Sequence, residues 1–118
     1  MGKVTFDDTD ANLVSDKYSQ GRGSVLRSEN IEVVKIRFAK GEQAAPHSHP
    51  EEQFTFILSG RLRVELPEKD EAYEIGPGEA TFNPSNILHG VEALEDTIAL
   101  SFKAPLSAED YAATGRLT

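Results

Sequence analysis

Short segments that are typical of β-strands follow one another through most of the chain. Each is rich in β-branched and aromatic residues in partial alternation. The segments are residues 24–27, 31–38, 53–58, 61–66, 72–75, 80–82, 88–94 and 97–102. The breaks between them carry residues that favour turns, such as Gly76-Pro77-Gly78. Closely spaced short strands predict an all-β fold, either a sandwich or a small antiparallel barrel.

The length of the chain suits one domain. Its 118 residues, of which 38% are hydrophobic and 27% charged, are enough to build one packed core. We divide the chain into an N-terminal arm at residues 1–22, a β-barrel at residues 23–105 and a C-terminal tail at residues 106–118. The run Ser107-Ala108-Glu109-Asp110 in the tail predicts the start of a short C-terminal helix.

Composition excludes several classes of protein. The formal net charge of -8 argues against a nucleic-acid partner, because such binding depends on clustered Lys and Arg. No apolar run has the length of a signal peptide or a membrane span, which predicts a cytoplasmic protein with no membrane partner. The chain has no cysteine, so any metal must be bound by nitrogen and oxygen atoms.

The three histidines of the chain lie in two places. His47 and His49 flank one serine, and His89 follows 40 positions after His49. Side chains at i and i+2 of an extended segment share a face, so this pair can converge on one point. A third imidazole from a distant strand would complete a set that suits a transition metal. An isolated pair of this kind is often coincidental, so the residues around it matter.

Glycine and proline recur at set distances from these histidines. Five residues separate Gly41 from His47, three separate His49 from Gln53, six separate Gln53 from Gly60, five separate Gly78 from Pro84, and four separate Pro84 from His89. This order resembles the two motifs of the cupin superfamily, with Gln53 in place of a glutamate, Asn86 in place of a glycine and Ala93 in place of an asparagine. The resemblance implies a jelly-roll barrel that holds one divalent transition metal, such as Ni, Zn, Mn or Fe. Its ligands would be His47, His49, Gln53 and His89.

Gln53 is the departure from the motif that bears on chemistry. Counting back from Gly60 favours Gln53 as the fourth ligand, whereas a one-residue bulge would present Glu52 instead. A third possibility is a site of three histidines alone. Because an amide carries no charge, Gln53 would leave the two positive charges of the metal uncompensated by its ligands. Such a metal is a stronger Lewis acid.

A narrower resemblance concerns the stretch from His47 to Gln53, together with Asn83-Pro84, His89-Gly90-Val91 and Ala104-Pro105. These residues are similar to the KdgF-like group of pectin-degradation proteins. That resemblance implies conversion of cyclic unsaturated uronates into their open-chain keto form at a His-His-Gln-His metal site. Polyketide cyclases of the cupin type also pair histidines with a glutamine ligand. The KdgF-like group carries an acidic residue at the position that we align with Ser101.

Candidate catalytic residues lie on two predicted strands. Alternation places Ser101 and Lys103 on one face, where they could act as proton donor or anion anchor if that face lines the cavity. A lysine that points to solvent at the barrel rim is the commoner arrangement. Arg63 would bind a substrate carboxylate if it faced inward.

The sequence thus supports several functional hypotheses. The first is an enzyme that uses a divalent cation as a Lewis acid on a small oxygenated substrate, with isomerisation of unsaturated uronates implied by the resemblance. The second is a metal-dependent dioxygenase. A third is a cupin that binds a small ligand such as a sugar without catalysis, or one that resembles a polyketide cyclase. The resemblance, and the need to cover open strand edges, also predict a homodimer.

Overall fold

The computed structural model describes residues 2–9, 12–15 and 17–104 of the chain. Nine strands lie in this part, namely β1 (Arg22–Arg27), β2 (Glu32–Phe38), β3 (Gln43–His47), β4 (Gln53–Ser59), β5 (Leu62–Leu66), β6 (Glu71–Ile75), β7 (Ala80–Asn83), β8 (His89–Ala93) and β9 (Thr97–Lys103). The one helical turn among the described residues is the 3-10 helix η1 (Pro67–Lys69). The predicted C-terminal helix lies outside the described residues. No helix in the described ranges is long and apolar enough to cross a membrane.

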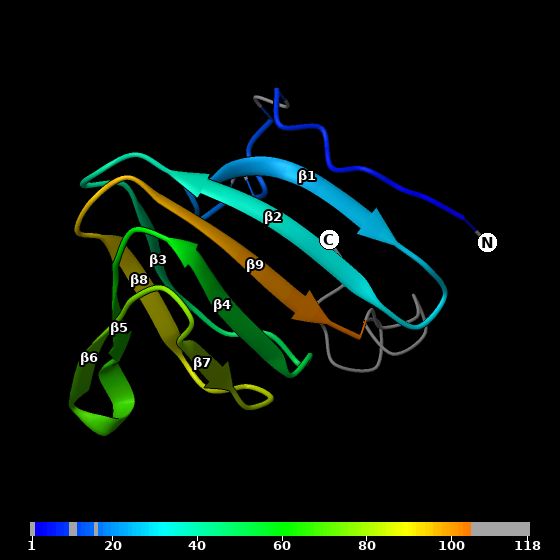
Figure 1. Ribbon diagram of the computed structural model, residues 1–118. Helices are drawn as coiled ribbons and strands as arrows, with labels where there is room; N and C mark the ends of the chain where they lie inside the picture. The colour runs from blue at the N-terminus through cyan, green and yellow to red at the C-terminus, as the bar shows by residue number, and fades with distance from the viewer. Residues whose placement is uncertain (1, 10–11, 16, 105–118) are drawn as a thin grey trace.

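The strands form two antiparallel sheets, which confirms the predicted all-β class (Figure 1). The five-stranded sheet has the order β1-β2-β9-β4-β7, and the four-stranded sheet has the order β3-β8-β5-β6. Residues from both sheets build one core, in which Ile57, Leu62 and Ala99 are fully buried. The two sheets therefore pack face to face with the apolar side chains between them. Closure of these sheets into a barrel stays a prediction.

Strand β3 does not appear among the segments expected from sequence. Its residues are Gln43-Ala44-Ala45-Pro46-His47, and alanine and proline are poor strand formers. Proline is tolerated here because β3 is an edge strand of its sheet. The register between β3 and β8 shifts between Ala44 and His47. This irregularity sets the position of the first histidine.

The N-terminal arm packs on the open edge of β3. Ser19 forms an isolated antiparallel bridge with Ala44, and the Ala45 amide donates to the Tyr18 carbonyl at 2.7 Å. These contacts satisfy backbone groups that an edge strand would otherwise leave open. The arm predicted as a separate segment therefore contributes to the body of the fold, and it brings Tyr18 next to the histidines.

Gly60 allows a turn that a larger residue would block. Its φ is +91°, and a Cβ added there would lie 2.3 Å from the carbonyl oxygen of Asp96. Gly78 has a similar φ of +83° but has nothing within 4 Å of such a Cβ. Both glycines occupy motif positions, so the comparison separates backbone strain from steric clash.

We expect Gly60→Ala to destabilise the fold more than Gly78→Ala. Each change costs about 1–2 kcal/mol for a left-handed backbone conformation. Gly60→Ala adds roughly 1–3 kcal/mol for the clash with rigid backbone. Urea unfolding of each metal-free variant measures its free energy of unfolding. Equal losses in Gly60→Ala and Gly78→Ala would contradict the clash.

Candidate metal centre

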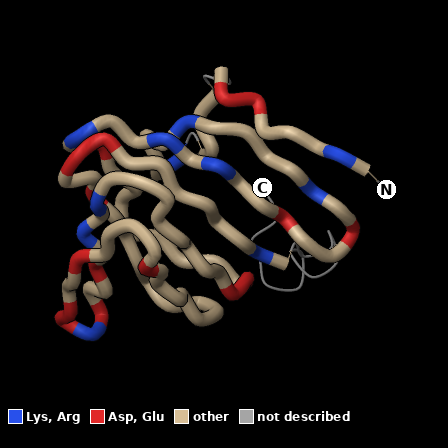
Figure 2. The backbone as a smooth tube through the Cα atoms, in the orientation of Figure 1, with Lys and Arg blue, Asp and Glu red and all other residues tan. Residues whose placement is uncertain are grey.

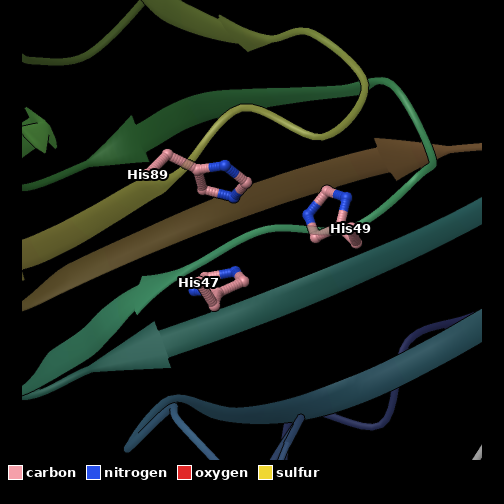
Figure 3. Close-up of side chains that lie close together, drawn as sticks. All are labelled: His47, His49 and His89. Atoms are coloured by element: carbon pink, nitrogen blue, oxygen red, sulfur yellow. The ribbon is translucent and has the colours of Figure 1, made fainter. Parts of the chain in front are cut away.

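Adjacent strands bring the three histidines together. His47 ends β3, His49 follows in the loop, and His89 begins β8 as the register partner of His47. Figure 3 shows the three rings pointing toward one another. Their ligand atoms all lie within 4.8 Å of one another, and His49 and His89 are buried. The geometry suits one ion bound by all three imidazoles.

A backbone carbonyl determines the tautomer of each ring. His47 Nδ1 donates to the Ala45 oxygen at 2.7 Å, His49 Nδ1 to the Glu51 oxygen at 2.9 Å, and His89 Nδ1 to the Ile87 oxygen at 2.9 Å. A carbonyl oxygen only accepts, so Nδ1 carries the proton and Nε2 keeps its lone pair. The Nε2 atoms of His49 and His89 are buried without a hydrogen-bond partner. Buried lone pairs of this kind fit a metal ligand set, in which Nδ1 is commonly hydrogen-bonded in this way.

Burial keeps all three imidazoles neutral. Desolvation is the largest cause that lowers their pKa values, and it takes the pKa of His47 to about 4. The positive charge of Lys103 lowers the pKa of each ring further. Neutral imidazole is the form that binds a metal ion, so the site is ready for a cation near pH 7.

The lowered pKa of His47 predicts how stability depends on pH. Between its ordinary value of 6.5 and its folded value of about 4, the unfolded chain binds a proton at His47 that the folded chain does not. The free energy of unfolding is therefore not reduced by His47 above the unfolded pKa of 6.5. It falls as the pH drops from this value toward the folded pKa of about 4. Glutamine does not bind a proton in this range. When the pH is lowered from about 7 to about 4.5, the free energy of unfolding of metal-free His47→Gln should therefore fall less than that of the unsubstituted metal-free protein. Identical losses in urea unfolding would contradict this prediction.

Gln53 lines the same space as the histidines. Its Nε2 donates to Ser101 Oγ at 2.7 Å, and its Oε1 accepts from Asn83 Nδ2 at 3.1 Å. The Gln53 side chain also raises the pKa of His49, against the larger effect of burial. Glu52 is exposed and does not line this cavity. The arrangement places Gln53 beside the triad, and its role as fourth ligand stays a prediction.

A row of polar side chains crosses the five-stranded sheet beside the histidines. Register partners on neighbouring strands form it in the order Arg27, Glu32, Lys103, Gln53 and Asn83. Antiparallel register partners share a face, and all five line a cavity of about 290 Å³ together with His47 and His89. We call these five residues the polar row.

Charge alternates along one half of the polar row. Glu32 forms an ion pair with Arg27, and its Oε2 lies 3.7 Å from Lys103 Nζ. The register places these three positions side by side on β1, β2 and β9. Figure 2 shows basic and acidic segments on neighbouring strands of the sheet. The Lys103 side chain is 19% exposed. Lys103 therefore faces the cavity rather than the solvent, and two cations share one carboxylate at its edge.

The other candidate residues from sequence divide between two faces. Ser101 is 2% exposed, lines the cavity and holds Gln53. Arg63 lies on the opposite face of its sheet, because Leu62 and Val64 point into the core on either side of it. Its Nη1 donates to Glu65 Oε1 at 3.0 Å. The structure does not bring Arg63 to the histidines, so we do not include it in the site.

Several residues of the site were missed by sequence reasoning. The Tyr18 ring stacks on His47 with 3.7 Å between centroids and 13° between planes. Glu32 and Glu51 are buried carboxylates that line the cavity. Asn83 could have been recognised as a residue of the site, because it directly precedes Pro84 of the second cupin motif. No local pattern could have placed Glu32 beside Lys103, because their strands are far apart in sequence.

Comparison with known proteins shows the family of the chain. The family model of the cupin domain matches residues 34–104. Oxalate decarboxylase OxdC of Bacillus subtilis is 30% identical over 101 residues, which cover 80% of this chain and 26% of that protein. The chain thus spans about a quarter of the length of this curated relative.

Solved structures at lower identity share the fold. The polyketide cyclase RemF from Streptomyces resistomycificus is 22% identical with a TM-score of 0.77, covering 98% of this chain and 93% of RemF. KdgF from Halomonas sp. is 23% identical with a TM-score of 0.72, covering 91% and 99%. An acetylacetone dioxygenase from Acinetobacter johnsonii is 16% identical with a TM-score of 0.73, covering 88% and 74%. With the family model matching most of the described strands and the histidines converging as the motifs require, the chain belongs to the cupin domain family.

Proposed function

We propose that the protein is a metal-dependent enzyme that uses a divalent cation as a Lewis acid on a small oxygenated substrate. The observation that carries this proposal is the convergence of three neutral imidazole nitrogens. Among the described residues, the group that could hold an ion comprises these histidines and no carboxylate. A divalent cation held there would polarise a carbonyl or hydroxyl oxygen of the substrate.

The polar row supplies the contacts that a substrate would need. Lys103 presents an ammonium group to the cavity, where it can bind an anionic group or donate a proton. Asn83 is 3% exposed and its Oδ1 has no hydrogen-bond partner, so it can accept from a substrate hydroxyl. The net charge of -8 repels an anion at long range, whereas Lys103 attracts it at short range. The cavity of about 290 Å³ restricts the substrate to a small molecule.

Unsaturated uronates are the substrate class that we propose. They carry a carboxylate for Lys103 and hydroxyl groups for Asn83 and the metal. The motif resemblance to the KdgF-like group supports this choice, and the fold shared with Halomonas KdgF is consistent with it. Conversion of the cyclic uronate to its open-chain keto form consumes no oxidant. A redox-silent cation is therefore sufficient for the reaction.

The test is an anaerobic assay of the purified protein with cyclic unsaturated uronates. We expect the alkene absorbance to fall with Zn²⁺-loaded or Ni²⁺-loaded protein and to persist after treatment with a chelator. Oxygen should not change the rate. Persistence of the absorbance with every metal-loaded form and every uronate would reject the uronate proposal.

A dioxygenase is the second candidate function. The fold shared with acetylacetone dioxygenase favours it, and a site of imidazole ligands also suits a redox-active iron. Oxygen consumption by the iron-loaded protein, with no activity of the zinc-loaded protein, would support this alternative. The fold shared with RemF keeps a polyketide-cyclase-like function as a further proposal of the Lewis-acid kind. The cytoplasmic location and the homodimer stay predictions.

A further inference from the structure

Two neighbouring glutamates in the loop after His49 have opposite environments. Glu51 is 7% exposed, and its side chain lines the cavity of the histidines. Glu52 is exposed. Carboxylates are almost never this buried unless a partner offsets the loss of hydration. The loop therefore places the Glu51 carboxylate inside the protein, beside the histidines.

Glu51 contacts the protonated side of the His49 ring. Its backbone oxygen accepts from His49 Nδ1 at 2.9 Å, and its carboxylate Oε1 lies 3.8 Å from the same nitrogen. Both distances are to Nδ1, the nitrogen that carries the proton. A negative charge at this position makes His49 a better electron donor through Nε2, as an outer carboxylate does behind other metal-bound histidines.

The negative charge of Glu51 would balance part of the positive charge that the ligand set leaves on the metal. Three imidazoles and an amide bring no negative charge to a cation with two positive charges. Removing a carboxylate from water costs several kcal/mol, which nearby positive charge can offset. A dication at His49 Nε2 and the buried Glu51 would each reduce the cost of burying the other.

We propose that Glu51 is the counter-charge of the metal centre and raises its affinity for a divalent cation. This inference rests on the metal centre of the proposed function and concerns no particular substrate. It makes Glu51 a positioning and charge-balancing residue that acts through His49. A carboxylate that only braced the loop would affect folding without affecting the affinity for metal.

Calorimetric titration of chelator-treated protein with Zn²⁺ tests the proposal. We expect Glu51→Gln to weaken Zn²⁺ binding by about 10–100-fold, the usual effect of losing an outer partner of a ligand. Glu52→Gln is the matched control, because it removes the same charge from the adjacent, exposed position. We expect the control to bind Zn²⁺ as the unsubstituted protein does.

Circular dichroism and thermal unfolding of the metal-free variants show whether each one folds. Glu51→Asp retains the negative charge with one methylene fewer, so it should bind Zn²⁺ more tightly than Glu51→Gln. This comparison also applies if Glu51→Gln folds poorly. Equal affinities of the unsubstituted protein and Glu51→Gln, or of the Asp and Gln variants, would overturn the role of Glu51. Failure of the unsubstituted protein to bind any divalent metal would instead reject the metal centre itself.

Discussion

Replacing His89 with alanine should abolish stoichiometric binding of a divalent metal. The three ligand atoms lie within 4.8 Å of one another, so each imidazole would supply one ligand to a single ion. Loss of an outer partner already costs about 10–100-fold in affinity, and loss of a direct ligand should cost more. Metal analysis after dialysis and calorimetric titration with Zn²⁺ would measure the loss. Activity, where it is detected, should disappear with the metal.

Arg63→Ala is the control for the His89 variant. Arg63 lies on the outward face of β5, so we expect the alanine variant to retain its metal and its activity. Thermal unfolding without metal would show that His89→Ala keeps its fold. Full occupancy of folded His89→Ala by one tightly bound ion would contradict the assignment of this ligand.

Replacing Lys103 with methionine should reduce turnover strongly while the metal remains bound. Methionine retains much of the length and apolar surface of the lysine side chain but lacks its charge and its protons. A proton donor in the transition state contributes about 10²–10⁴-fold to the rate, and an anion anchor affects KM in addition. Metal affinity should persist or rise slightly, because a nearby positive charge is removed.

Steady-state kinetics with a uronate that the protein converts in the anaerobic assay would measure this effect. Lys69→Met is the matched control, since Lys69 is exposed in η1 and does not line the cavity. A lower kcat would support proton donation, and a higher KM with unchanged kcat would support anion binding. Unchanged values of both would remove Lys103 from the site.

Much of the fold and the histidine triad could be predicted from sequence. The strand segments were recognisable because alternation of apolar side chains reflects burial of one face. The pair His47 and His49 predicted convergence on one point, because side chains two apart on an extended segment share a face, and the resemblance to the cupin motifs implied that His89 joins them. β3 was missed because its alanines and proline pair with β8 through tertiary context rather than through their own preference for strands.

The rest of the site depends on strand order, which local patterns do not encode. β9 lies between β2 and β4, so Glu32, Lys103 and Gln53 become neighbours although they are distant in the chain. The same topology determined that Lys103 faces inward. Arg63 shows the converse: the sequence allowed an inward-facing Arg63, whereas in β5 its neighbours Leu62 and Val64 face the core. Likewise, only the path of the loop separates buried Glu51 from exposed Glu52.

Anomalous diffraction from crystals of the Zn²⁺-loaded protein tests the metal centre most directly. We predict one ion per chain bound to Nε2 of His47, His49 and His89 at about 2.0–2.1 Å from each nitrogen. The same map would show whether the Gln53 oxygen completes the set. An ion bound elsewhere, bonding through Nδ1, or a protein that takes up no ion at these histidines would contradict the account.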